Sequence, residues 1–121
     1  MDTAPPFLHE TIELVKQLSL DHRLAVVSSS GRTEVEPPLA LVGLLPCFQI
    51  VVTCEDVQRL KPAPDPYLLA AKRLGARKPL VIEDSDAGVA SAQAAGFELI
   101  RVSGAATMAS ELRAFLALER S

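Results

Sequence analysis

Residues 80–88 constrain the fold of this chain more than any other stretch. They open with Leu-Val-Ile, continue with Glu83, Asp84 and Asp86, and lead into a run of small residues. A short apolar run followed at once by acids is typical of a buried parallel strand whose carboxyl end opens into a site. Clustered carboxylates repel one another, so they are usually retained for a cation or a phosphoryl group. The stretch therefore predicts a strand, a polar site at its end and a helix beyond it.

Apolar runs and helical spacings alternate along the whole chain. Four short apolar runs predict strands, at residues 24–27, 49–53, 80–82 and 98–102. Segments with helical spacing or helix caps predict helices, at residues 7–18, 33–45, 66–74, 86–95 and 108–118. Strict alternation favours parallel strands with helices on both faces. We expect a three-layer α/β/α fold with a parallel sheet of about four strands.

Capping residues set the expected helix ends. Thr33, with an acid three residues later, predicts the start of the second helix and confines Pro37 and Pro38 to its first turn. The N-caps of the third and fourth helices are expected at Asp65 and Asp86, and their ends at Gly75 and Gly96.

Composition and charge exclude several classes of protein. The 121 residues are 49% apolar and 22% charged, which is typical of one globular domain. A net charge of −3 gives no basic footprint for nucleic acid, and no apolar run is long enough to span a membrane. Cys47 and Cys54 lack metal-ligand spacing, and we expect both to be reduced residues in or near the core. With no visible signal peptide, these features predict a cytoplasmic protein.

Polar side chains suited to phosphate follow three of the predicted strands. Ser28 and Ser29 come after the first, Lys61 lies in a proline-rich loop after the second, and Glu83 and Asp84 end the third. The carboxyl ends of parallel strands share one edge of a sheet, so these groups can converge there. Lysine neutralises phosphate charge, and carboxylates hold Mg²⁺. Taken singly, each motif is more often a polar turn, a solvated lysine or acids at a helix N-terminus.

Three motifs in this order resemble those of the haloacid dehalogenase-like hydrolases. They are Val-Val-Ser-Ser-Ser at residues 26–30, Lys-Pro-Ala-Pro-Asp-Pro-Tyr at 61–67 and Ile-Glu-Asp-Ser-Asp-Ala-Gly-Val at 82–89. The resemblance is greatest to the branch that contains phosphoglycolate phosphatase and β-phosphoglucomutase. It implies a Rossmann-like core and a Mg²⁺-dependent phosphatase that acts on a small phosphorylated metabolite.

The resemblance also implies roles for individual residues. Ser28, with Ser29 beside it, would bind the oxygens of the transferred phosphoryl group. Lys61 would bridge the phosphate and the nucleophile. Asp84 would ligate Mg²⁺, and Glu83 would be a ligand directly or through water.

Two parts of the family pattern are not found in the sequence. Family members begin with a strand ending in Asp-x-Asp, which supplies the nucleophile, and a helical cap follows that strand. No apolar strand precedes Asp2, and no second Asp follows it at the right step. The resemblance therefore implies that residues 1–121 are the single, C-terminal part of a truncated core. The cap and the central strand of the sheet would be absent.

The missing strand would leave a gap between the predicted strands 24–27 and 80–82. Each buried backbone group without a partner costs about 1–3 kcal/mol. We therefore expect the two strands to close up and pair directly, or a second copy or a partner chain to fill the gap.

Two functional hypotheses follow from these motifs. In the first, the chain belongs to an enzyme that hydrolyses a phosphate ester through an aspartyl-phosphate, and it is inactive alone because the nucleophile is missing. In the second, it is a non-catalytic remnant that binds phosphate and Mg²⁺, or a subunit that needs a partner chain. Turnover of p-nitrophenyl phosphate with Mg²⁺ separates the two.

Overall fold

The four strands of the structure run parallel to their neighbours but form two separate pairs. The structure is a computed structural model that describes residues 9–104 and 108–120, with the side chains of the last helix described up to residue 114. Strand β1 (Ala25–Val27) pairs with β2 (Ile50–Val52), and β3 (Leu80–Glu83) pairs with β4 (Glu98–Arg101). Within the described residues no ladder joins β1 to β3.

The α/β class with parallel strands is confirmed. Of the two alternatives expected for the gap, direct pairing of the strands on either side of it is wrong. The reason lies in the helices that cover the strands. Helix α3 (Asp65–Leu74) packs against β1, β2 and the helix α4 (Asp86–Ala95), which itself covers β3 and β4. Closing the gap would force these packed helices into one another, so the two pairs stay apart.

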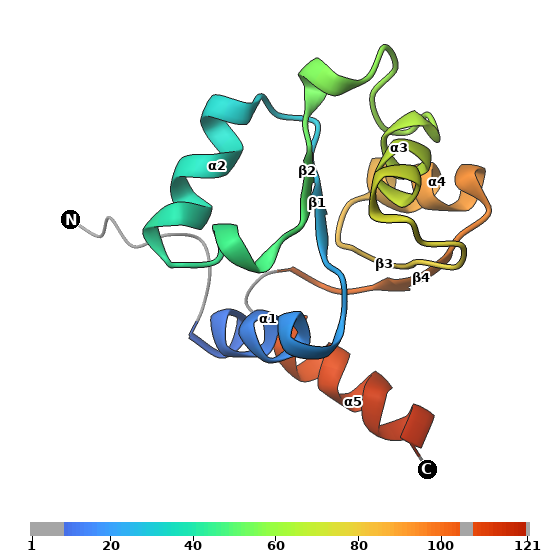
Figure 1. Cartoon of the computed structure of the whole chain (residues 1–121). Helices are drawn as coiled ribbons and strands as arrows, with labels where there is room; N and C mark the ends of the chain where they lie inside the picture. The colour runs from blue at the N-terminus through green and yellow to red at the C-terminus, as the bar shows by residue number, and fades with distance from the viewer. Residues whose placement is uncertain (1–8, 105–107, 121) are drawn as a thin grey trace.

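The β1–β2 pair lies between two helices. Figure 1 shows α2 (Arg32–Leu41) on one side of the pair and α3 on the other. Two 3₁₀ turns flank β2 in the sequence: η1 (Leu45–Cys47) precedes it and η2 (Cys54–Asp56) follows it. Val52 is fully buried, as expected for a strand covered on both faces.

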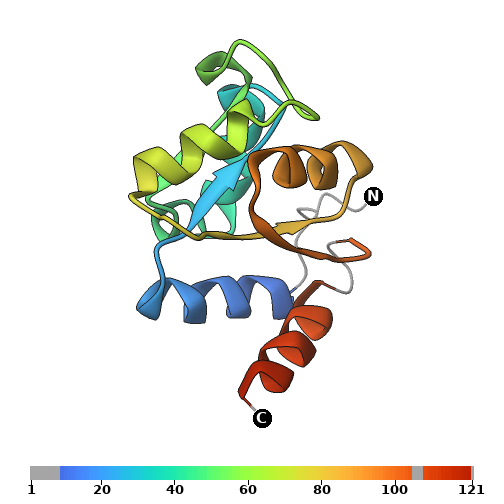
Figure 2. The ribbon, with the colours of Figure 1, turned by 90° about the vertical axis from the view of Figure 1, so that its right-hand side faces the viewer.

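The β3–β4 pair also has helices on both faces. Figure 2 shows α3 and α4 above it, and α1 (His9–Asp21) and α5 (Met108–Arg120) below it. Side chains of alternate residues in these strands point to opposite faces of the pair. Val81 and Leu99 pack with Tyr67 and Ala92 above the pair. Below it, Ile82 and Ile100 pack with residues of α1 and α5, namely Leu14, Leu18, Ala109 and Leu112.

Strand bounds match the expected ranges to within one residue at each end, but some helix ends differ. Helix α1 continues to Asp21, three residues beyond its expected end, and the first two residues of that prediction lie outside the described part of the chain. Helix α3 begins at Asp65 itself, after Pro64 as N-cap. Gly75 and Gly96 end α3 and α4 as expected, in the left-handed region at φ 70° and 79°.

The start of α2 corrects the expected cap. The N-cap is Gly31, not Thr33, and the Glu34 side chain accepts a hydrogen bond from the Gly31 N–H at 3.2 Å. Because the helix begins earlier, Pro37 and Pro38 lie in its interior rather than in its first turn. Each proline there removes one hydrogen bond of the helix.

Two expectations from composition can be compared with the structure. Cys47 and Cys54 are both free and half-buried. No described helix has the length and apolar character needed to cross a membrane.

Candidate active site

Lys61 joins the carboxyl ends of β1 and β3. Its Nζ donates to the Val27 carbonyl oxygen at 3.0 Å and to Glu83 Oε2 at 2.5 Å. Val27 is the last residue of β1 and Glu83 the last residue of β3. Ser28 and Asp84 are the next residues along the chain, so the structure brings the three sequence motifs to one rim of the strands.

The loop that carries Lys61 is fastened on both sides. The Ser91 hydroxyl of α4 donates to the Ala63 carbonyl oxygen at 2.6 Å. Arg59 and Asp65 form an ion pair at 2.9 Å across the base of the loop. The loop's prolines fix several φ angles, and the peptide bond between Lys61 and Pro62 is cis. The lysine side chain is therefore presented to the rim from a stiff loop, with only 11% of its surface exposed.

Glu83 is enclosed by hydrogen-bond donors on both of its carboxylate oxygens. Oε2 accepts from Lys61 and from the Tyr67 hydroxyl, each at 2.5 Å. Oε1 accepts from the Asp84 and Ser85 N–H groups at 3.2 and 3.4 Å, and from the Ser85 hydroxyl at 3.2 Å. The side chain is buried, at 7% exposed. In this arrangement Glu83 holds Lys61 in place and has no oxygen left over for a metal.

The donors around Glu83 determine its ionisation. Burial opposes the charge, but the hydrogen bonds from Lys61 and Tyr67 outweigh that cost, and the pKa of the Glu83 carboxyl lies below its ordinary value. Tyr67 responds in the opposite direction: burial first, and then its hydrogen bond to Glu83, raises the pKa of the phenol. Tyr67 therefore remains a neutral donor and Glu83 an anion at neutral pH.

The serine turn offers a hydroxyl at the same rim. Ser28 is half-buried, and its Oγ accepts a hydrogen bond from the Ser30 N–H at 3.0 Å. That bond uses a lone pair of the oxygen, so the hydroxyl proton is still available to a ligand oxygen. Ser29 is exposed in the turn. The two serines thus follow directly on the end of β1, Ser28 half-buried and Ser29 exposed.

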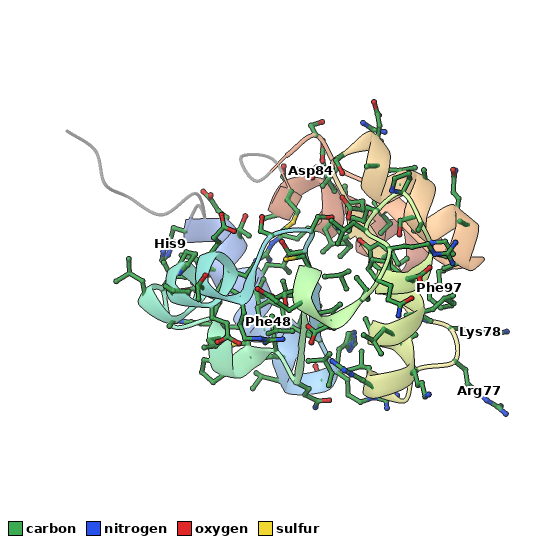
Figure 3. All side chains as sticks on the ribbon, turned by 90° about the horizontal axis from the view of Figure 1, so that it is seen from above. His9, Phe48, Arg77, Lys78, Asp84 and Phe97 are labelled. Carbon is green, nitrogen blue, oxygen red and sulfur yellow. The ribbon has the colours of Figure 1, made fainter. Side chains whose placement is uncertain are left out.

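The metal-binding residues expected from the sequence have different environments. Asp84 is exposed, whereas both oxygens of Glu83 are already engaged. Figure 3 shows Asp84 on the opposite side of the molecule from Arg77 and Lys78, which point outward from the loop before β3. Among residues 9–104 and 108–120, no three His, Cys, Asp or Glu residues are grouped so that they could hold a metal. Mg²⁺ keeps several waters and takes one or two carboxylates, so Asp84 fits as one ligand and Glu83, as placed here, does not.

Three residues of the site were not assigned a role from the sequence. Tyr67 is the last residue of the Lys-Pro-Ala-Pro-Asp-Pro-Tyr motif, and the sequence alone gives no role to its hydroxyl. Ser85, rather than the expected Asp86, is the N-cap of α4, and its Oγ accepts from the Gly88 N–H at 3.0 Å. Gly88 packs so closely on Glu83 that a Cβ there would overlap the carboxylate. The only sequence signal for these roles is their position inside the two motifs.

Comparisons with known proteins agree with the fold and the order of motifs. Residues 3–102 match the profile of the family described as haloacid dehalogenase-like hydrolase. Fructose-1-phosphate phosphatase YqaB of Escherichia coli is 37% identical over 93 residues, which are 75% of this chain and 50% of that protein. The crystal structure of CbbY from Rhodobacter sphaeroides in complex with phosphate has a TM-score of 0.71 at 26% identity, covering 79% of this chain and 45% of that one.

A third comparison concerns the fold alone. A hydrolase of the same superfamily from Ehrlichia chaffeensis has a TM-score of 0.79 at 21% identity, covering 93% of this chain and 58% of that chain. The chain thus spans about half the length of YqaB and of these solved structures. The match of the family profile over residues 3–102 shows that the chain belongs to the haloacid dehalogenase-like hydrolase family.

Proposed function

We propose that this chain supplies the phosphate- and Mg²⁺-binding rim of a phosphatase for a small phosphorylated metabolite. The observation that carries the proposal is the position of Lys61 between the ends of β1 and β3. One cation there is surrounded by a serine turn and an exposed carboxylate, which suits a phosphate ester with a divalent ion. YqaB, whose name gives fructose 1-phosphate as its substrate, supports a substrate of this size.

Each residue of the rim has a distinct part in this proposal. Ser28 and Ser29 would donate to phosphoryl oxygens, and Lys61 would neutralise their charge. Asp84 would hold Mg²⁺, which supplies further charge neutralisation when bound. Glu83 and Tyr67 position Lys61 and do not touch the substrate. Residues 1–121 would form the C-terminal part of the core, without a cap, in a cytoplasmic protein with reduced cysteines.

We further propose that the chain does not turn over substrate alone. The only described acid in contact with Lys61 is Glu83, and its oxygens are occupied by donors, so it is a poor nucleophile. The same observation favours the second candidate function, a non-catalytic domain that binds phosphate and Mg²⁺ or a subunit that requires a partner chain. Binding and turnover must therefore be measured separately.

Binding is tested by titrating inorganic phosphate, with and without Mg²⁺, into the isotope-labelled chain. We expect the amide signals of residues 28–31 and 84–86 to shift, and Lys61→Met or Ser28→Ala to weaken binding about tenfold or more. Lys72→Met, which removes an exposed lysine from α3, is the matched control. Absence of saturable shifts, or equal weakening by Lys72→Met, would contradict the proposal.

Turnover is tested with p-nitrophenyl phosphate and Mg²⁺. We expect no hydrolysis above background by the chain alone. Hydrolysis that is lost in Asp84→Asn would show instead that a complete catalytic site forms from these residues, and it would overturn the proposed inactivity.

A further inference from the structure

The serine turn, residues 28–31, is tied by its backbone to the chain that leaves β2. The Ser28 N–H donates to the Val52 carbonyl oxygen at 2.9 Å, and the Cys54 N–H donates to the Ser30 carbonyl oxygen at 3.0 Å. Figure 1 shows the connection from β1 to α2 and the chain that leaves β2 together at the top of the view. Both ties join backbone to backbone, so neither requires a particular side chain at these positions.

The side chain of Glu55 makes a third tie. Its Oε1 accepts from the Arg32 N–H, directly after the turn, at 3.1 Å. The same oxygen accepts from the Thr53 hydroxyl at 2.5 Å. Thr53 is fully buried directly after β2, so it holds the carboxylate from a packed position. The Thr53 hydroxyl first, and then the Arg32 N–H, keep the pKa of the Glu55 carboxyl below its ordinary value, so the group is ionised at neutral pH.

Gly31 allows the Glu55 carboxylate to lie against the turn. The Gly31 backbone is extended, at φ −79° and ψ 160°, which is a conformation that any residue adopts. A Cβ at this position would nevertheless lie 2.9 Å from Glu55 Oε2. The glycine is therefore required by the close approach of the carboxylate and not by the backbone conformation.

The ties determine which donors of the turn are left for a ligand. Four of the five N–H groups of residues 28–32 already donate hydrogen bonds. Their acceptors are, in order along the chain, the Val52 carbonyl, Ser28 Oγ, Glu34 and Glu55. Among the described residues, the Ser29 N–H alone of these five has no acceptor. Together with the Ser28 hydroxyl proton, it makes two donors whose directions depend on the conformation of the turn.

We propose that Glu55 is a positioning residue of the phosphate site. Its carboxylate holds the serine turn in the conformation that presents the Ser28 hydroxyl and the Ser29 N–H to a phosphoryl oxygen. Glu55 does not touch the ligand and acts only through the turn. This inference rests on the proposed function, because it takes the serine turn as a phosphate-binding element.

The charge of Glu55 and its hydrogen bonds have opposite effects on phosphate binding. The negative charge repels an anion bound at the turn, so it weakens binding. The hydrogen bonds to Glu55 preorganise the turn, so they strengthen binding. Glutamine keeps an oxygen that accepts from both donors and loses the charge, whereas alanine loses both. The two substitutions therefore separate the two effects.

The test measures the dissociation constant of inorganic phosphate from the amide shifts of the isotope-labelled chain. We expect Glu55→Ala to weaken binding about fivefold or more, and Glu55→Gln to bind within about twofold of the wild type or more tightly. Glu98→Ala removes an exposed acid from the amino end of β4 and is the matched control. Gly31→Ala displaces the same carboxylate, so it should weaken binding to a similar extent and add nothing further in the Glu55→Ala background.

Coupling to Ser28 distinguishes positioning from a general loss of stability. In the Glu55→Ala background the Ser28 hydroxyl is no longer held toward the ligand. Ser28→Ala should then weaken binding about twofold or less, against about tenfold in the wild type. Lys61→Met should keep its full effect in that background, because a separate loop holds the lysine. A general loss of stability would change neither of these ratios.

Three outcomes would overturn this inference alone: binding that is unchanged in Glu55→Ala, an equal loss in Glu55→Gln, or an undiminished effect of Ser28→Ala in the Glu55→Ala background. Absence of phosphate binding by the wild-type chain would instead overturn the proposed function, and this inference with it. Should Glu55→Ala fail to fold, Gly31→Ala supports the same comparisons with Ser28→Ala and Lys61→Met.

Discussion

At the scale of single residues, Glu83 shows how a buried carboxylate is kept charged. An ionised carboxylate away from water is costly unless donors surround it. Here Lys61, Tyr67 and the backbone at the start of α4 supply those donors, so both oxygens are satisfied. Removing a donor would leave the buried charge without a partner, and the full desolvation cost would then lower the stability of the fold.

The acid dependence of stability reports on this carboxylate. The pKa of Glu83 in the folded chain lies below its ordinary value of 4.5, so its contribution is fully present above that pH and is lost as the pH falls through the folded pKa. We expect Glu83→Gln to cost about 2 kcal/mol at neutral pH and less in acid. Urea unfolding at about pH 7 and about pH 3 measures the difference. Glu10→Gln, on the exposed side of α1, is the control, and a constant cost across pH would contradict the prediction.

Gly88 leads to a second prediction at the scale of single residues. Glycine inside a helix usually destabilises it, so Gly→Ala is commonly favourable by about 1 kcal/mol. A Cβ at Gly88 would overlap the Glu83 carboxylate, so we expect Gly88→Ala to lower the free energy of unfolding by about 1–3 kcal/mol instead. In a Glu83→Ala background the overlap disappears, and the same substitution should become neutral or stabilising. A double-mutant cycle with no coupling between the two sites would contradict this account.

At the scale of elements, α2 combines a weak interior with strong attachments at its start. Pro37 and Pro38 interrupt its hydrogen bonds. Contacts of its first residue, Arg32, compensate for these lost hydrogen bonds. The backbone N–H of Arg32 donates to Glu55 at 3.1 Å, and its guanidinium contacts Asp56 at 2.8 Å. The helix is thus held to the end of β2 by charge pairs as well as by its own hydrogen bonds.

This balance predicts the effect of removing a proline. Pro37 is exposed, so Pro37→Ala restores a helix hydrogen bond without emptying the core. We expect the free energy of unfolding to rise by about 1 kcal/mol, because part of the cost of an interior proline is offset by its rigidity in the unfolded chain. Pro46→Ala is the matched control: this proline is at the start of η1, where no N–H is needed, and its loss should not stabilise. Thermal unfolding of both variants provides the measurement.

Sequence periodicity located every strand to within a residue because the apolar runs are short and sharply bounded. Helix starts were harder to predict. The N-caps are Gly31 and Ser85 rather than the expected Thr33 and Asp86. Glycine, serine, threonine and aspartate are all favourable N-cap residues, so the local sequence does not show which of two neighbouring candidates caps the helix. The role of Tyr67 could not be predicted from the sequence, because the contact of its hydroxyl with Glu83 depends on the packing of α3 against β3.

The gap between the strand pairs is a feature of the whole molecule, and the sequence alone did not predict how the strands on either side of it are arranged. The cost of unpaired backbone suggested that β1 and β3 would close up or that another chain would fill the gap. In the structure Tyr67 of α3 packs with Val27 of β1 and Val81 of β3, and we attribute the separation of the two pairs to this packing. Tertiary packing therefore outweighs backbone pairing in this part of the chain. Among the described residues, Lys61 donates hydrogen bonds to the carboxyl ends of both β1 and β3.

Lys61 should consequently couple the two halves of the molecule. Breaking a buried ion pair by removing one partner costs about 3–5 kcal/mol, and the remaining donors to Glu83 should reduce this to about 2–3 kcal/mol for Lys61→Met. We expect amide exchange to accelerate in β1 and β3 together, since the lysine contacts the ends of both. Lys72→Met, on the exposed face of α3, should leave both strands unchanged. If exchange accelerated in one pair only, the two pairs would be stabilised independently and the lysine would not be the link between them.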